Sequence, residues 1–291
     1  MNLKSKKAVS VGMLVAAGIV WGASFVIVKD AMDYISPLWQ LALRLLIACI
    51  LMLLIFHKRL TQIKRRAMFQ GIWLGVLFFL ALMFQNLGCK ETTASKCSFL
   101  TVSYVAFVPI LELLILKKRL TRRKLLSVVI CLCGMALLTL NGSFSVEKGD
   151  LLVIVCGLLY AFHILYIDYC STTMEAVDMH LLQIITATVL SFLAAIIFEP
   201  IPVVTNVHCW MGLIYCGIFE IVLGFFFQLK GQQNTSPTLA GILVSMESVY
   251  GSIFAAIFLR ESFTLRMIAG CLAIFLAAVV EGQESPAKKE G

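Results

Sequence analysis

The chain has 291 residues, of which 60% are hydrophobic and only 14% are charged. A soluble domain carries roughly a quarter charged residues, so this composition excludes a soluble globular protein. The net charge of +8 comes from cations between the apolar runs, a pattern typical of membrane orientation and not of nucleic-acid binding. We therefore expect a polytopic membrane protein that binds no nucleic acid.

Ten apolar segments follow one another, several of them near the roughly 20 residues that cross a hydrocarbon core. Each should be helical, because lipid offers no partner for an unpaired backbone group. The first is too long for the apolar part of a signal peptide, so we interpret it as a span. The expected spans are 9–28, 38–56, 67–88, 97–116, 125–140, 150–168, 179–198, 208–229, 238–259 and 266–281.

The positions of Lys and Arg predict that both termini are cytoplasmic. With that orientation, 17 of the 24 cations lie in cytoplasmic segments and six lie in outside segments. The remaining cation, Arg44, lies within the second span. An excess of cations on the cytoplasmic side is the rule for membrane proteins.

Two similar segments with different charge indicate an inverted repeat. KKRLTRRK at 117–124 is rich in cations, whereas RESFTLR at 260–266 has few. Leu, Thr and Arg recur at a constant offset in the pairs Leu116/Leu259, Thr121/Thr264 and Arg123/Arg266. Five spans separate the copies, so they face opposite sides and only the cytoplasmic copy keeps its cations. The expected fold class is an all-α membrane protein of ten transmembrane helices in two inverted five-helix repeats, 1–145 and 146–291, a frequent transporter design.

Three stretches carry a family resemblance: WGASFVIVK from Trp21, FLTVSYVAFVP from Phe99 and SPTLAGILVSMESVYGSIFAAIFLRESFT from Ser236. In their order and spacing, the chain resembles the drug/metabolite transporter superfamily in its EamA-type ten-helix branch. The resemblance implies a carrier that usually exports small metabolites such as amino acids or their derivatives. It departs from the family at Glu247-Ser248, where Glu-Pro is frequent.

Ionisable residues inside the spans are candidates for the site, because a charge at the bilayer centre costs roughly 2.5–3.5 kcal/mol. Glu247, in the ninth span, either binds an amine or a proton, or makes a structural hydrogen bond. Glu220, in the eighth span, has no family counterpart. His163 shares a helix face with Tyr160 and either relays protons or packs. Glu220, Glu247 and His163 are therefore the proton-coupling candidates.

Further polar and aromatic residues complete the expected substrate site. Arg44 either neutralises Glu220 or Glu247 or holds a substrate carboxylate, and we favour an ion pair. Gln183 occupies the place of Arg44 in the second repeat. The remaining candidates, each with packing as the alternative, are Trp21, Tyr104, Tyr160 and Gln228. At the cytoplasmic end of the fourth span, Glu112 and Lys117 form an expected pair.

The ten cysteines lie almost all within apolar runs, and we interpret them as small packing residues. Their spacing indicates neither a disulfide framework nor a metal site, and we expect no cofactor. HExxH, GxSxG and P-loop motifs are absent from the sequence, which argues against an enzyme.

The sequence thus predicts a secondary transporter of small metabolites in a bacterial inner membrane. We expect it to work by alternating access as an exporter, with proton coupling left open. Its partners would be a small-molecule substrate and the bilayer, and a homodimer is allowed. The alternatives are a flippase for lipid-linked substrates and a non-transporting assembly subunit.

Overall fold

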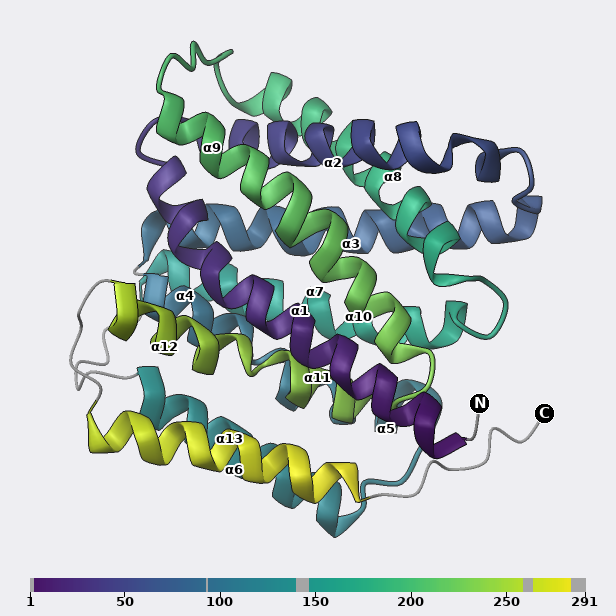
Figure 1. Cartoon of the computed structure of the whole chain (residues 1–291), viewed down its shortest axis with the longest axis vertical. Coiled ribbons are helices and arrows are strands. Elements are labelled where there is room, and N and C mark those ends of the chain that lie inside the picture. Colours follow the sequence, from purple (N-terminus) through teal and green to yellow (C-terminus); the bar gives the residue numbers. More distant parts are fainter. Residues whose placement is uncertain (1–2, 93, 140–146, 259–263, 284–291) are drawn as a thin grey trace.

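The computed structural model describes residues 3–92, 94–139, 147–258 and 264–283, and within them every regular element is a helix. The first half of the chain forms α1 (Leu3–Ala31), α2 (Pro37–Leu60), α3 (Arg65–Glu91), α4 (Ala94–Thr101), α5 (Tyr104–Leu116) and α6 (Arg122–Thr139) (Figure 1). The second half forms α7 (Lys148–Cys170), α8 (Ala176–Phe198), α9 (Val207–Tyr215), the π-helix η1 (Cys216–Gly224), α10 (Phe225–Gln232), α11 (Pro237–Val244), α12 (Glu247–Phe258) and α13 (Leu265–Gly282).

Eight helical segments of the described chain are long and apolar enough to cross a membrane. They are α1, α2, α3, α4 with α5, α7, α8, α9 with η1 and α10, and α13. The predicted span at 125–140 is helical to Thr139, and the span at 238–259 contains α11 and α12 on either side of a break, but neither span is among the eight. α6 carries three cations in its first turn, which makes it less apolar than the eight. The chain is a multi-pass membrane protein.

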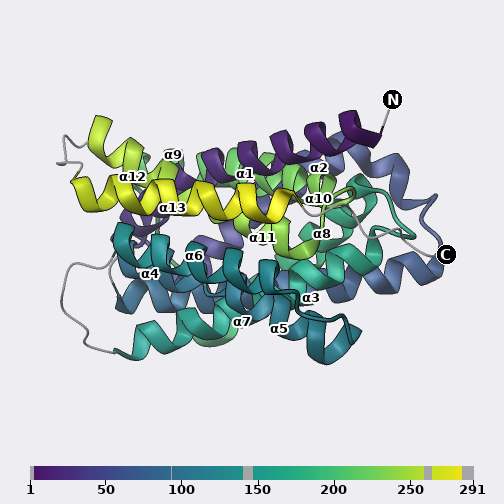
Figure 2. The ribbon, with the colours of Figure 1, turned by 90° about the horizontal axis from the view of Figure 1, so that it is seen from below.

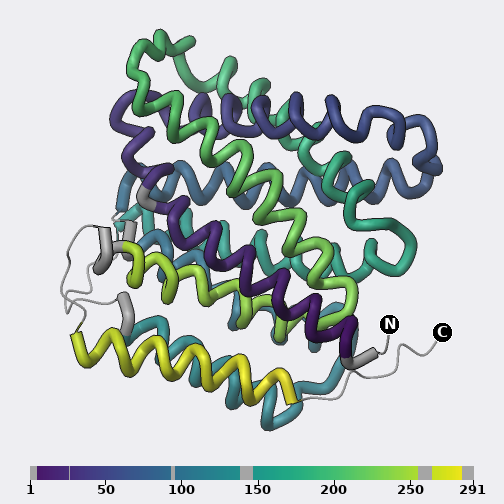
Figure 3. Tube along the Cα trace, viewed as in Figure 1, coloured from purple at the N-terminus to yellow at the C-terminus, as the bar shows by residue number. Residues whose placement is uncertain are grey.

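The helices run back and forth between two ends of the molecule (Figures 1 and 3). Figure 2 shows two layers, with α1 and α13 on one side and α5 and α7 on the other. The first helix begins where the last one ends, and there Lys7 Nζ donates to the carbonyl of Gly282 at 2.9 Å. We call this the terminal end, and the other the far end.

Contacts between helices repeat when the two halves are exchanged. α2 packs against α8 and α6 against α13, which are pairs of equivalent spans. α1 packs against α12, and its counterpart α7 packs against α5 in the same way. Similarly, α3 contacts α7, while η1 and α10 contact α1. This reciprocity is what two halves related by a two-fold axis would produce.

Both the fourth and the ninth predicted spans are interrupted near their middle. The first break, at Val102 and Ser103, separates α4 from α5, and the second, at Ser245 and Met246, separates α11 from α12. The two breaks are 143 positions apart, the offset that also relates Thr121 to Thr264. The break before Glu247 therefore forms without the proline that the family resemblance would have supplied.

A loop of different length explains why two offsets relate the halves. Residues 61–64 join α2 to α3, whereas 199–206 join α8 to α9, so the second loop has four more residues. Equivalent positions lie 139 apart before these loops and 143 apart after them. Residues 140–146, which contain the predicted boundary between the repeats, and residues 259–263 lie outside the described residues.

Candidate functional site

A pocket between the two halves encloses about 570 Å³ of space, including its open end. Side chains from both halves form its walls, with α1 and α7, α3 and α10, and the two broken spans each contributing. The lining residues are Trp21, Ser24, Phe25, Val28, Gln85, Cys89, Thr101, Tyr104, Tyr160, Ile164, Glu220, Phe225, Gln228, Val244 and Glu247.

Much of this lining consists of equivalent positions from the two repeats. The pairs are Trp21/Tyr160 and Phe25/Ile164 at an offset of 139, and Gln85/Gln228, Thr101/Val244 and Tyr104/Glu247 at an offset of 143. Tyr104 and Glu247 are each the first residue of the helix that follows a break. The pocket therefore lies where the two repeats meet, and among these pairs only Tyr104/Glu247 sets an ionised type of side chain against an uncharged one.

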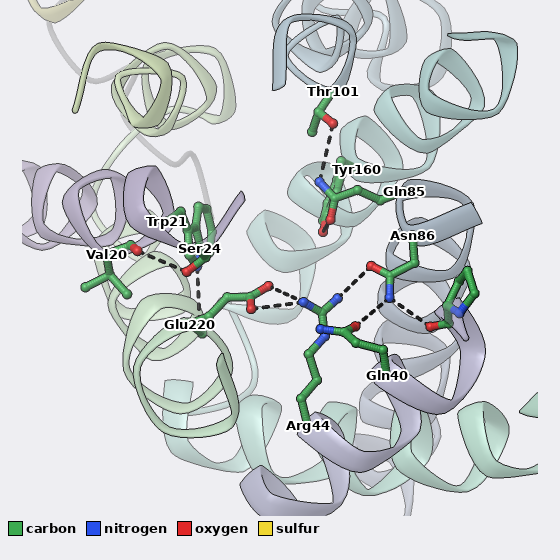
Figure 4. Close-up of polar contacts among 11 residues, drawn as sticks. Val20, Trp21, Ser24, Gln40, Arg44, Gln85, Asn86, Thr101, Tyr160 and Glu220 are labelled. Carbon is green, nitrogen blue, oxygen red and sulfur yellow. Dashed lines mark hydrogen bonds and ion pairs between the residues drawn. The ribbon is translucent and has the colours of Figure 1, made fainter. Parts of the chain in front are cut away.

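An ion pair connects the pocket wall to the protein interior (Figure 4). Arg44 Nη1 donates to both carboxylate oxygens of Glu220, at 2.9 and 3.0 Å. Arg44 Nη2 donates to Asn86 Oδ1 at 3.0 Å, and Asn86 Nδ2 donates to Gln40 Oε1 at 2.7 Å. Arg44, Asn86 and Gln40 are fully buried. The guanidinium is thus committed to Glu220, as we favoured from the sequence, and does not line the pocket among the described residues.

Glu220 lies in the π-helix, a rare conformation that is frequent at functional sites. Its backbone carbonyl accepts a hydrogen bond from Trp21 Nε1 at 3.1 Å. Gly224 makes this contact possible, because a Cβ there would lie 2.3 Å from Trp21 Nε1. Gly217 likewise allows α2 to approach, since its Cβ would lie 2.9 Å from the carbonyl of Arg44. The two glycines bring Trp21 and Arg44 onto either side of Glu220.

Gln85 and its partners form the opposite wall. Tyr160 donates from its hydroxyl to Gln85 Oε1 at 3.5 Å, and Gln85 Nε2 donates to Thr101 Oγ1 at 3.3 Å. The tyrosine ring also packs edge-on against Tyr104, with centroids 6.3 Å apart. These contacts fix the orientation of the Gln85 amide.

Three buried polar groups in the pocket lack a partner among the residues that the structure describes. Within that part of the chain, the Tyr104 hydroxyl and Gln228 Oε1 make no hydrogen bond. Glu247 is 4% exposed, and no hydrogen bond or ion pair joins its carboxylate to another residue of the described chain. Its backbone is held against α1, where a Cβ on Gly22 would lie 2.8 Å from the Glu247 carbonyl. The backbone at Glu247 therefore packs closely on α1, and the side chain lines the pocket.

His163 and Gln183 belong to a different cluster, although we expected them in the substrate site. His163 Nε2 lies 3.1 Å from Gln183 Oε1, and Gln183 Nε2 lies 3.0 Å from His180 Nδ1. His180 Nε2 in turn lies 2.9 Å from the carbonyl of Val222. All three side chains are fully buried, and none lines the pocket in the part of the chain that is described. Their hydrogen bonds tie α7, α8 and η1 together.

A second buried ion pair lies toward the terminal end. Glu112 Oε2 accepts from Lys124 Nζ at 2.8 Å and from Thr238 Oγ1 at 2.8 Å. Lys118 Nζ lies 3.7 Å from Glu112 Oε1, so the partners of Glu112 are these lysines and not the expected Lys117. Lys117 instead ends α5 in the left-handed conformation, with φ of 52°. The cluster joins α5, α6 and α11.

Two of the cysteines form a disulfide, so our interpretation of all ten as packing residues is wrong. Cys89 and Cys97 are bonded, with their Cα atoms 5.4 Å apart, and connect α3 to α4. Their separation of eight residues gave no sequence signal, because it matches no recognised framework. Cys89 also lines the pocket, close to Lys29, whose Nζ donates to the carbonyl of Cys89 at 2.5 Å.

Comparisons with known proteins agree with this architecture. An uncharacterized transporter of Archaeoglobus fulgidus is 26% identical over 267 residues, which cover 92% of this chain and 83% of the relative. An S-adenosylmethionine/S-adenosylhomocysteine transporter of Chlamydia muridarum is 23% identical, covering 88% of each chain. A solved structure described only as a protein crystal structure has the same fold, with a TM-score of 0.77 and 15% identity over 93% of this chain and 95% of the other.

The family assignment comes from a profile match along nearly the whole chain. The sequence profile of the EamA-like transporter family matches residues 9–140 and again 147–281. These two matches leave only short tails and one linker uncovered. The chain is therefore a member of the EamA-like transporter family.

Proposed function

We propose that this protein is a secondary transporter that moves small organic metabolites, amino acids or their derivatives, by alternating access. The observation that carries the proposal is the pocket at the meeting point of the two halves, lined by equivalent residues from both. Transporters built from inverted repeats bind their substrates at this place, next to interrupted helices. Rocking one half against the other would then expose the same pocket to each side in turn.

This mechanism requires ten membrane crossings in two inverted five-helix repeats. The reciprocal helix contacts and the equivalent breaks at 102–103 and 245–246 support that arrangement. The excess of cations in the loops at the terminal end supports cytoplasmic termini in an inner membrane. With this orientation, the pocket extends through Val28 and Cys89 toward the outside.

We propose that the Glu112 cluster helps to close the terminal end in this conformation. Its hydrogen bonds hold α11 against α5 and α6 below the pocket. Opening toward the cytoplasm would have to separate these helices. We propose that breaking the contacts between Glu112, Lys124 and Thr238 is one step of the inward-opening movement.

The composition of the walls supports an amino-acid-derived substrate. Trp21, Tyr104 and Tyr160 offer flat apolar surfaces, while Gln85 and Gln228 offer amide groups that can orient a polar substrate. The Chlamydia relative is named as a transporter of S-adenosylmethionine and S-adenosylhomocysteine, which are themselves amino-acid derivatives. Pocket walls from both halves favour a carrier over a lipid-linked flippase or an assembly subunit.

We further propose export coupled to protons, with Glu247 as the coupling residue. A carboxylate that faces the pocket without a partner can bind either a proton or a substrate, which is what exchange requires. Glu220 is less suited, because Arg44 occupies both of its oxygens. His163 lies outside the pocket lining.

Transport by the purified protein in liposomes tests this function. We would follow radiolabelled amino acids and S-adenosylmethionine, with and without a pH gradient, and compare Glu247→Gln with Glu175→Gln. Glu175 is a matched control because it is also a glutamate, but its side chain is 70% exposed and does not line the pocket. We expect saturable transport by the unmodified protein and by Glu175→Gln, and none by Glu247→Gln. No movement by folded, correctly inserted protein would refute the proposal.

A further inference from the structure

The charges around the pocket do not balance. Among the lining residues of the described chain, the charged side chains are the carboxylates of Glu220 and Glu247, with no Lys, Arg or His. Arg44 neutralises Glu220 by donating to both of its oxygens. One negative charge, that of Glu247, is therefore left without a counterion when the carboxylate is ionised.

The cation that follows the pocket-lining Val28 in sequence does not supply that counterion. Lys29 lies one residue beyond the pocket-lining Val28, but its ammonium group donates to the backbone carbonyls of Cys89 and Thr92, at 2.5 and 2.9 Å. A buried carboxylate without a partner is costly, so a bound cation would stabilise the occupied pocket strongly.

The uncharged groups that lack partners are complementary to the same kind of ligand. Gln228 Oε1 is an acceptor, and the Tyr104 oxygen can accept as well as donate. Together with Glu247 they place three acceptors in the lining of one pocket, and an ammonium group has three donors. The rings of Trp21 and Tyr160 add faces that attract cations.

We propose that the pocket selects organic cations: molecules with a flat apolar body and an ammonium or other onium group, for which Glu247 is the counterion. The proposal rests on the transport function above and narrows its substrate class. A free carboxylate on the ligand would find no cation to receive it, because Arg44 is already engaged. Amino-acid derivatives without a free carboxylate, or with a compensating second cation, are therefore preferred to ordinary zwitterionic amino acids.

Binding to the purified protein, measured without transport, tests the charge preference. Equilibrium dialysis would compare matched probes of equal ring and chain: tryptamine with indole-3-propionate, and phenethylamine with 3-phenylpropionate. We expect saturable binding of the amines and at least about tenfold weaker binding of the carboxylates. Tryptophan, the zwitterion, should also bind at least about tenfold more weakly than tryptamine.

Variants locate the effect at Glu247. Glu247→Gln should weaken tryptamine binding at least about tenfold, Glu247→Asp should keep the preference for amines, and Glu175→Gln should leave binding unchanged. If Glu247→Gln does not fold, the comparison of amines with carboxylates and the binding by Glu247→Asp still test the charge preference.

Equal or tighter binding of the carboxylates, binding unaffected by Glu247→Gln, or no saturable binding of either amine would overturn the proposal. Liposome transport of an amino acid without amine binding would overturn this proposal alone. Amine binding without any transport would instead overturn the proposed function.

Discussion

Removing Arg44 should destabilise the protein far more than removing Arg44 and Glu220 together. Arg44→Met deletes two hydrogen bonds to Glu220 and one to Asn86, and leaves a carboxylate that is 6% exposed without its counterion. Breaking a buried ion pair in this way costs about 3–5 kcal/mol, whereas replacing both partners is often nearly neutral. Glu220→Gln alone should cost a similar amount, because it leaves the buried guanidinium unpaired.

The double variant makes the reasoning quantitative. We expect Arg44→Met with Glu220→Gln to be more stable than either single variant, with a coupling energy of at least about 3 kcal/mol. SDS-induced unfolding of the purified protein in mixed micelles would measure the free energy of unfolding of all four proteins. A double variant whose loss equals the sum of the two single losses would refute the pairing.

Two further predictions test the helix packing and the inverted repeat. Gly22→Ala should cost about 1–3 kcal/mol in the same unfolding assay, because its Cβ would lie 2.8 Å from the carbonyl of Glu247. Gly12→Ala, where a Cβ meets nothing within 4 Å, is the control and should lose no stability. Cysteines placed at Gln62 and at the 87%-exposed Val203, in the equivalent loops of the two halves, should react with an impermeant maleimide from opposite sides of the membrane. Labelling of both from the same side would contradict the inverted repeat.

Much of this fold could be predicted from the sequence, because the membrane imposes strong patterns on it. Apolar runs must be helical in lipid, and the described parts of these runs are largely helical. The orientation and the inversion, which the distribution of cations indicates, stay predictions. Position within a span was enough to select Trp21, Tyr104, Tyr160, Glu220, Gln228 and Glu247, which the structure places in one pocket lining. A polar residue at membrane depth usually faces a cavity or a partner, and this rule needs no tertiary information.

What the sequence left open depends on close packing between helices. From the sequence, Arg44 could pair with either Glu220 or Glu247. The close packing of η1 on α2, which Gly217 allows, brings Glu220 within hydrogen-bond distance of Arg44. His163 and Gln183 looked equally suited to the pocket, yet their mutual hydrogen bond with His180 places them in a separate cluster. The π-helix around Glu220 and the pairing of Cys89 with Cys97 have no local pattern that would predict them.

The disulfide bears on the proposed orientation independently of the charge distribution. It lies near Lys29, which is a whole membrane-crossing helix away from the residues where α1 begins. The cytoplasm of a mesophilic bacterium keeps thiols reduced, whereas the periplasm or cell exterior allows a disulfide to persist. With both termini cytoplasmic, as proposed, the junction of α3 and α4 lies outside, where this bond can form and persist. In that orientation the bond fixes the corner between α3 and α4 once both helices have been inserted.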